Sequence, residues 1–437
     1  MTMASSVPGV QQWRVEPQAA RVPIAAGAVG TVIEWYDFAV YAYFASFLGS
    51  NFFPSTVPYR SLLLSFAVFG VGFFMRPVGG FVFGHYGDKI GRRNALAATI
   101  ILMGIATFLV GVLPTYGQIG IAAPILLVIL RLFQGFSAGG EWAGAAAFLV
   151  EYAPPGRRGF IGSWQQVSVG GGFLLGSAGA TLLASIMSPE SLAGWGWRIP
   201  FLSGLVMTAI GLYLRLAVEE TPKFRAIQKA GQVADAPIAE AFGKHGKRLL
   251  TVVGFTLSGT VAYYVFLAYF PTYVSTVLKL PLRTASSVNT IGLILFLIMV
   301  PFLGVLSDRI GRRPLLLAHA AAAAILAYPL FLLMESRSFG AILIAQIIGV
   351  AIQGLFSGAA VAGYVEMFPT RIRYTAISVP YNITVAAFGG TAPFIATYLV
   401  STTGNHLSFT YYLMAAGIIS FLTYLLVVKE TCWSELQ

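Results

Sequence analysis

The sequence predicts an all-α membrane protein of twelve transmembrane helices in two six-helix pseudo-symmetric halves. Hydrophobic residues make up 57% of its 437 residues and charged residues only 10%, whereas soluble domains average about 25% charged. A helix needs about 20 apolar residues to cross the hydrocarbon core, so a chain of this length with short loops has room for about twelve spans. One basic loop sequence also occurs twice, which indicates a duplicated unit.

Apolar runs separated by glycine, proline and charged residues define the expected spans. Six lie in the first half, near 24–49, 60–83, 94–114, 121–150, 160–186 and 198–217. Six lie in the second half, near 249–277, 286–307, 314–334, 338–365, 375–402 and 407–428. The longest polar stretch separates them, so we expect an N-terminal half over 1–218, a cytoplasmic linker over 219–248 and a C-terminal half over 249–437.

Lysine and arginine are distributed unequally between the expected loops. If the N-terminus is inside, most of them fall in inner loops and tails, as the positive-inside rule requires. We therefore expect a multi-pass inner-membrane protein with both termini in the cytoplasm. The basic inner loops account for the net charge of +11, so no nucleic-acid partner is expected. Residues 1–20 lack an apolar core before a cleavage site, so no cleavable signal peptide is expected.

Two short patterns repeat at nearly the same offset. The sequence from Gly84 to Arg93, GHYGDKIGRR, corresponds to GVLSDRIGRR from Gly304 to Arg313. A second pattern, E-x-x-P-x-x-x-R, begins at Glu151 and again at Glu366. Glycines permit tight turns and close helix approach, and an acidic residue at a helix end can hold arginines and the positive N-terminus of the next helix. These loops therefore suit a contact between moving helices.

The repeated loop resembles the signature of the major facilitator superfamily, G-x-x-x-D-[RK]-x-G-R-R. The resemblance implies the major facilitator fold and alternating access between two halves. In that family the loop is a gate latch and not a substrate site. The gating residues implied here are Gly84, Asp88, Arg92, Arg93, Glu151, Arg158, Gly304, Asp308, Arg312, Arg313, Glu366 and Arg373.

A narrower resemblance, over almost the whole chain, is to the metabolite:proton symporters. This group includes carriers for 2-oxoglutarate, citrate, shikimate and proline or betaine. The sequences that carry the resemblance are EWYDF from Glu34, MRPVGG from Met75, RLFQGFSAGGE from Arg131, WGWRIPF from Trp195 and ETP from Glu220. Members with different cargoes share these sequences, so the resemblance predicts a proton-coupled carrier without identifying its substrate.

Five ionisable residues fall inside expected spans, namely Glu34, Asp37, Arg76, Arg131 and Glu141. A charged group at mid-membrane costs about 2.5 to 3.5 kcal/mol, so it is usually paired or functional. Helix rise places Asp37 and Arg131 at similar depth, near the middle of the membrane. In related sugar porters an aspartate and an arginine at the matching places form the proton-coupling pair. We expect Asp37 to accept the proton with Arg131 as its counter-ion, and a purely structural ion pair is the alternative.

The remaining three charges form a second level, nearer the cytoplasm. Glu34 lies on the same helix face as Asp37 at a spacing of three residues. An arginine, Arg76, between two carboxylates, Glu34 and Glu141, fits either a proton relay or a structural network. The sequence does not separate these interpretations.

Polar and aromatic residues on other spans are candidates for the substrate pocket, although most such residues in membrane spans contact lipid or other helices. The candidates are Arg131, Arg76, Gln134, Gln165, Gln166, Tyr263, Tyr264, Tyr269, Gln353, Tyr381 and Asn382.

The leading function is proton-coupled import of a small carboxylate-bearing metabolite by a monomer embedded in the lipid bilayer. Two membrane arginines favour an organic acid such as a dicarboxylate. A zwitterion such as proline or glycine betaine also presents a carboxylate and is the alternative. The four histidines show no metal-ligand spacing, and there is no nucleotide loop or nucleophile elbow, so neither an enzyme, a catalytic residue, a metal nor a cofactor is expected.

Overall fold

The computed structural model describes the backbone of residues 17–57, 59–90, 92–139, 141–151, 153–154, 156–216, 237–368, 373–434 and 436. Side chains are described for these residues except 17–29, 84–90, 92–96, 143, 144, 148, 151, 214–216, 237–245, 247, 374 and 375. Helices and short connections account for all of this described part, which contains no β-strand.

The helices of the first half pair up into the expected spans. They are α1 (Pro17–Tyr43), α2 (Ala45–Phe52), α3 (Arg60–Phe74), α4 (Arg76–Ile90), α5 (Arg92–Val112), α6 (Tyr116–Ile119), α7 (Ala122–Ala138), α8 (Glu141–Glu151), α9 (Arg158–Ile186), α10 (Pro189–Gly194), the short η1 (Gly196–Arg198) and α11 (Ile199–Leu216). The second span consists of α3 and α4, and the fourth consists of α7 and α8.

The second half begins inside the expected linker. Its elements are α13 (Pro237–Tyr263), the π-helical η2 (Tyr264–Tyr269), α14 (Phe270–Thr272), the π-helical η3 (Tyr273–Val277), α15 (Leu282–Ile310), α16 (Arg312–Met334), α17 (Phe339–Glu366), α18 (Arg373–Thr384), the π-helical η4 (Val385–Gly389), α19 (Ala392–Thr403) and α20 (Thr410–Leu426). Residues 237–248 of the expected linker are thus helical, and residues 219–236 lie outside the described residues.

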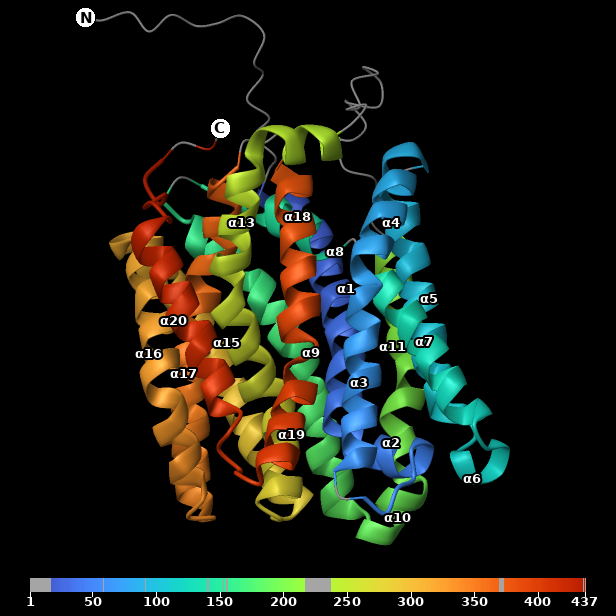
Figure 1. The fold of residues 1–437 in the computed structure, drawn as a ribbon. Coiled ribbons are helices and arrows are strands. Elements are labelled where there is room, and N and C mark those ends of the chain that lie inside the picture. Colours follow the sequence, from blue (N-terminus) through green and yellow to red (C-terminus); the bar gives the residue numbers. More distant parts are fainter. Residues whose placement is uncertain are drawn as a thin grey trace, which may run out of the picture.

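The long helices run side by side as a bundle (Figure 1). Within the described residues, seven helices are long and apolar enough to cross a membrane, and three shorter apolar helices accompany them. The segment after α20 lies at the same end of the bundle as the start of α13 (Figure 1). The predicted fold class is an all-helical bundle with twelve spans, and the observed bundle agrees with it.

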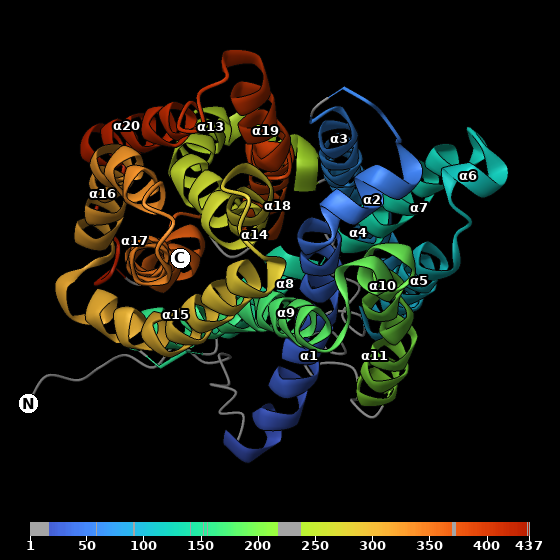
Figure 2. The same cartoon turned by 90° about the horizontal axis from the view of Figure 1, so that it is seen from below.

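The two groups of helices meet along a seam. Figure 2 shows α5, α7 and α11 on one side and α13, α16 and α20 on the other. Along the seam α9 packs against α15, and α8 packs against α17 and α18. Any substrate path between the groups must therefore pass these helices.

Glycines allow the second and fourth spans to approach closely. A Cβ atom at Gly135 would collide with the carbonyl oxygen of Gly72, and one at Gly139 with the carbonyl oxygen of Arg76. Because glycine has no Cβ, these backbones can touch. These contacts fix the positions of α3 and α4 relative to α7. They thereby also fix the relative positions of the two membrane arginines, Arg76 and Arg131.

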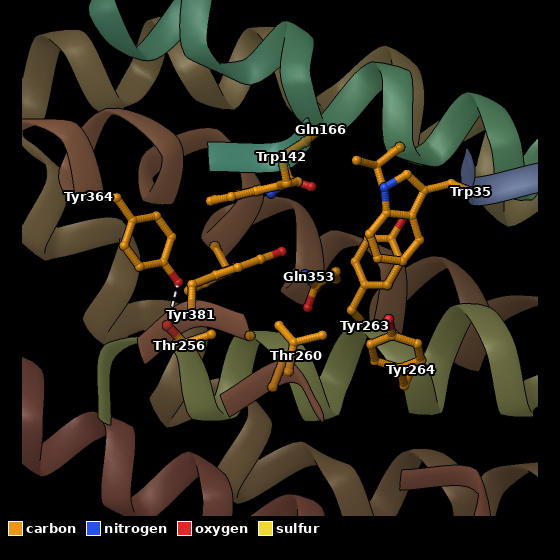
Figure 3. Close-up of a pocket in the computed structure, with 14 residues that line it drawn as sticks. Trp35, Trp142, Gln166, Thr256, Thr260, Tyr263, Tyr264, Gln353, Tyr364 and Tyr381 are labelled. Carbon is orange, nitrogen blue, oxygen red and sulfur yellow. Dashed lines mark hydrogen bonds between the residues drawn. The ribbon is translucent and has the colours of Figure 1, made fainter. Parts of the chain in front are cut away.

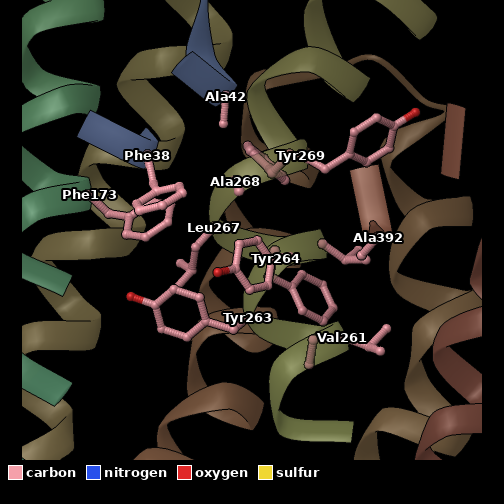
Figure 4. Close-up of a cluster of buried hydrophobic side chains, with 14 of the residues drawn as sticks. Phe38, Ala42, Phe173, Val261, Tyr263, Tyr264, Leu267, Ala268, Tyr269 and Ala392 are labelled. Carbon is pink, nitrogen blue, oxygen red and sulfur yellow. The ribbon is translucent and has the colours of Figure 1, made fainter. Parts of the chain in front are cut away.

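An aromatic core fills the centre of the bundle, where α1, α9 and η2 meet (Figure 4). Phe173 and Tyr263 stand edge to face, with ring centroids 5.3 Å apart. Phe38 packs on Phe73 at 4.6 Å. The core joins both groups of helices and surrounds the buried charges.

Candidate functional site

Asp37 of α1 and Arg131 of α7 form a buried ion pair. The Arg131 Nη1 atom lies 3.1 Å from the Asp37 Oδ2 atom, and both side chains are almost fully buried. The other carboxylate oxygen, Oδ1, accepts hydrogen bonds from the Thr107 hydroxyl and the Gln134 amide, each at 2.6 Å. Gln134 also accepts a bond from Arg131 at 2.9 Å. The Asp37 carboxylate therefore has three donors.

Aromatic rings surround the Arg131 guanidinium. Its Cζ atom lies 4.4 Å from the Tyr41 ring centroid and 4.9 Å from that of Phe38. Cations are attracted to ring faces at such distances. The structure thus brings Asp37, Arg131 and Gln134 together, and it adds Thr107, which the sequence did not single out because threonine is unremarkable in an apolar span.

Glu34 and Arg76 form a second buried ion pair. The Arg76 Nη2 atom donates to the Glu34 Oε1 atom at 2.9 Å. Among the described residues this is the one hydrogen bond to the Glu34 side chain, and the Arg76 Nε and Nη1 atoms have no partner. The Arg76 guanidinium also packs against the Trp35 ring at 5.3 Å. Arg76 is completely buried, so these two donor atoms are also shielded from solvent.

Glu141 belongs to the same group of charges. It begins α8 and is 8% exposed, and its charge acts on Glu34 together with those of Arg76 and Asp37. The structure therefore brings Glu34, Arg76 and Glu141 together, as expected from the sequence for the second level of charges.

A narrow cavity of about 30 Å³ lies between the two groups of helices, beside the charges. It is lined by Trp35, Trp142, Gln166, Val169, Thr256, Gly259, Thr260, Tyr263, Tyr264, Gln353, Phe356, Tyr364, Tyr381 and Val385 (Figure 3). The first four belong to α1, α8 and α9, and the rest to the second half. Six of these side chains are tryptophan or tyrosine.

The cavity is closed on one side by stacked rings. Trp142 of α8 and Tyr381 of α18 lie face to face, with ring centroids 3.8 Å apart and an interplanar angle of 7°. Tyr364 stands edge-on to both rings, and its hydroxyl lies 2.7 Å from that of Thr256 (Figure 3). These aromatic contacts join the first half to the second.

Five of the expected pocket residues line the cavity, namely Gln166, Tyr263, Tyr264, Gln353 and Tyr381. Gln165 is buried but does not line it. Asn382 instead donates to the Gly139 carbonyl at 3.4 Å, and Tyr269 packs on Phe66 and Phe409. Sequence reasoning missed Trp35, Trp142 and Tyr364. The position of Trp142 directly after Glu141 was the available signal.

A second cluster, which we call the latch, joins the ends of α9 and α15. The Asp308 carboxylate accepts hydrogen bonds from the backbone N–H groups of Gly159 and Phe160 at 2.8 and 2.9 Å. It also accepts one from Arg312 at 2.8 Å. A Cβ atom at Gly304 would lie 2.7 Å from the Gly159 carbonyl oxygen. A carboxylate at a helix N-terminus is favourable, so the latch stabilises the closed contact between halves.

Glu366 extends the latch. Its carboxylate binds Arg312 at 3.0 Å and lies 3.6 Å from Arg158. Two other expected gating residues bind backbone carbonyl groups: Arg313 donates to Tyr424 and Leu425, and Arg373 donates to Phe368. Their counterparts Gly84, Asp88, Arg92, Arg93 and Glu151 lie outside the residues whose side chains the structure describes.

The segment after α20 lies on the latch. The Glu430 carboxylate accepts from the backbone N–H groups of Arg312 and Arg313, each at 3.0 Å, and the Thr431 hydroxyl donates to Glu366 at 2.7 Å. Arg158 donates to the Ser434 carbonyl at 2.8 Å. Burial alone would raise the pKa of Glu430, but the backbone N–H groups outweigh it and hold the pKa below its ordinary value of 4.5.

Comparison with known proteins agrees with this arrangement. A family model described as Major Facilitator Superfamily matches residues 39–378 and 278–431. The chain is 40% identical over 420 residues to a proline/betaine transporter of Escherichia coli (strain K12), covering 94% of this chain and 84% of the relative. It is 39% identical over 426 residues to a glycine betaine/proline/ectoine/pipecolic acid transporter of Dickeya dadantii (strain 3937), covering 95% and 85%.

Solved structures of the same fold include a xylose transporter from Escherichia coli in a partially occluded inward-open conformation. Its TM-score is 0.75 at 19% identity, covering 95% of this chain and 99% of that one. A D-xylose–proton symporter structure matches with a TM-score of 0.72 at 21% identity, covering 96% and 98%. At such identities the likeness concerns the fold. The chain is therefore a multi-pass membrane transporter, not an enzyme, and it belongs to the major facilitator superfamily and its metabolite:proton symporter family.

Proposed function

We propose that this protein imports a zwitterionic osmolyte of the proline and betaine kind together with a proton. It would do so as a monomer in the inner membrane, with both termini in the cytoplasm. The observation that carries the proposal is the central cavity lined by tryptophan and tyrosine rings. Ring faces attract quaternary ammonium groups, and the attraction is stronger where water is excluded. An ammonium group without N–H donors suits such a lining.

Arg76 suits the opposite pole of a zwitterion. Its guanidinium packs on Trp35, which lines the cavity, and its Nε and Nη1 atoms have no partner among the described residues. A carboxylate that binds a guanidinium in a bidentate manner uses Nη2 together with Nε or Nη1, so the substrate would share the Nη2 group with Glu34 or displace Glu34 from it. A betaine or proline molecule would then lie with its carboxylate on Arg76 and its ammonium group among the rings.

The cavity fits an organic acid less well, although the two membrane arginines led the sequence analysis to prefer one. Arg131 packs on the rings of Phe38, Tyr41 and Phe69, none of which lines the cavity. Arg76 packs on Trp35, which does line it, so Arg76 is the arginine beside the cavity. A second carboxylate would face aromatic rings, whose faces are electronegative. The names of the similar transporters also favour the zwitterion.

Alternating access would act through the seam. A cavity of about 30 Å³ is too small for a proline or betaine molecule, so Trp142 and Tyr381 must separate before a substrate can enter. Closure of these rings around the ammonium group would occlude it. The latch of Asp308, Arg312 and Glu366 would hold the cytoplasmic side shut until it opens to release the substrate.

The test is uptake into proteoliposomes of purified protein. Labelled glycine betaine, proline, 2-oxoglutarate, citrate and shikimate are compared with and without an inward proton gradient. Saturable accumulation of betaine or proline that depends on the gradient supports the proposal. Accumulation of an organic acid alone contradicts the substrate class, and uptake indifferent to the gradient contradicts proton coupling.

A further inference from the structure

The two carboxylates of α1 have different surroundings although they are three residues apart. Asp37 accepts from Arg131, Thr107 and Gln134, whereas Glu34 accepts one hydrogen bond from the described residues, from Arg76. Hydrogen bonds to the ionised form stabilise it. A proton on Asp37 would compete with three donors, while a proton on Glu34 would compete with one.

Glu34 lies among charges of both signs. Arg76 faces it from α4, Glu141 from α8 and Asp37 from its own helix. The aromatic residues Tyr264 and Tyr381 approach it from the second half. Glu34 thus shares a buried site with a second carboxylate, Glu141, and like charges at such a site favour binding of a proton to one of them, whereas Arg76 favours the ionised form.

We infer that Glu34 carries the coupled proton, and that the Asp37–Arg131 pair holds spans one, three and four together. The inference rests on the proposed function, because it assigns the carboxylate of the substrate to Arg76. When that carboxylate binds Arg76, it replaces Glu34 as the counter-ion. Glu34 then loses the Nη2–H bond and takes a proton from water on the outer side.

The exchange is balanced in charge and in protons. Arg76 stays cationic throughout and changes one anionic partner for another. Glu34 becomes a neutral acid, and its proton leaves on the cytoplasmic side when the substrate departs and Arg76 returns to it. A zwitterion carries no net charge, so each cycle moves one positive charge inward. Glu141 is the competing proton acceptor in the same group.

The test compares Glu34→Gln, Asp37→Asn and Glu141→Gln with the wild-type protein and with a surface control, Glu190→Gln, whose side chain is exposed on α10. Each protein is reconstituted in proteoliposomes containing a pH-sensitive dye. Three quantities are measured: accumulation of labelled betaine under a proton gradient, betaine counterflow without a gradient, and proton entry on addition of betaine. Thermal unfolding reports whether each variant is folded.

Glu34→Gln is expected to lose accumulation and betaine-driven proton entry while counterflow remains measurable. Asp37→Asn is expected to unfold at lower temperature and to lose accumulation and counterflow in equal proportion. Proton-coupled transport by Glu34→Gln overturns the inference. The inference is also overturned if Asp37→Asn or Glu141→Gln, and not Glu34→Gln, loses proton entry while keeping counterflow. Failure of the wild-type protein to accumulate betaine or proline would instead overturn the proposed function.

Discussion

Trp142 and Tyr381 come from opposite sides of the seam, yet their rings lie parallel at 3.8 Å, closer than any other ring pair in the described part of the chain. A stacked pair of this kind contributes about 0.5 to 1.5 kcal/mol beyond its buried area. An ammonium group gains about 0.5 to 2 kcal/mol from a ring face, so binding of a substrate between the rings can offset the cost of opening the pair.

The first prediction concerns this ring pair. Trp142→Leu removes one ring face, so the KM for betaine should rise about 2- to 30-fold, the equivalent of about 0.5 to 2 kcal/mol. Trp142→Phe, the matched control, should show the smaller effect. Uptake kinetics in proteoliposomes measure both. An unchanged or lower KM in Trp142→Leu would mean that the rings close the cavity without contacting the ammonium group.

The second prediction concerns the carboxylate pole. Arg76→Gln alone leaves Glu34 as an unpaired buried charge, which costs about 3 to 5 kcal/mol of stability. The double variant Glu34→Gln/Arg76→Gln removes both charges and should unfold close to the wild-type temperature. It should still bind choline, which lacks a carboxylate, but should lose betaine affinity. Competition binding on the solubilised protein tests this, and equal loss of both ligands would argue against a carboxylate contact.

The third prediction uses Cys432, the one cysteine of the chain. Its thiol is buried against the carbonyl groups of Ser307 and Asp308, and burial raises its pKa, so it should react slowly with maleimides. Asp308→Asn weakens the bonds to Gly159 and Phe160. Charge-assisted hydrogen bonds contribute about 1.5 to 3 kcal/mol each, so labelling should accelerate at least about tenfold. Glu190→Gln should label at the wild-type rate. An unchanged labelling rate in Asp308→Asn would contradict the proposed role of Asp308 in the latch.

The fourth prediction concerns pH. Because the pKa of Glu430 is lower in the folded protein than its ordinary value of 4.5, its stabilising effect is present above that value and is lost as pH falls through the folded pKa. Thermal unfolding of the solubilised protein between pH 6 and pH 3 should therefore show a smaller wild-type advantage over Glu430→Gln at the acid end. A constant difference across this range would contradict the assignment.

Much of this architecture was predictable from the sequence. Long apolar runs defined the spans, and helix rise placed Asp37 opposite Arg131, where the two side chains meet. The two repeated patterns and the resemblance they carry singled out Asp308, Arg312 and Glu366 as gating residues. The structure brings the three side chains together, and their role in gating stays a prediction. In each case the signal was a charge inside or beside an apolar run, where few partners are possible.

The aromatic lining was harder to predict. Spans that are apolar on every side carry no periodic signal for the face that lines a cavity. Tyr364 was therefore indistinguishable from packing residues, and Trp142 differed from them only in following Glu141. The preference for an organic acid arose because both arginines were counted as substrate ligands. Only the three-dimensional arrangement shows that Arg76, and not Arg131, packs on a ring that lines the cavity.

The π-helical segment η2 starts at Tyr264, where α13 ends at Tyr263, and both of these neighbouring tyrosines line the cavity. A π-helical turn accommodates more residues than an α-helical one. Deleting one residue between 264 and 269 would therefore leave every pocket side chain in the sequence but rotate the outer part of the span by about 100°. Chain length at this point, as much as residue identity, specifies the site, and a relative lacking one residue here would present a different cavity.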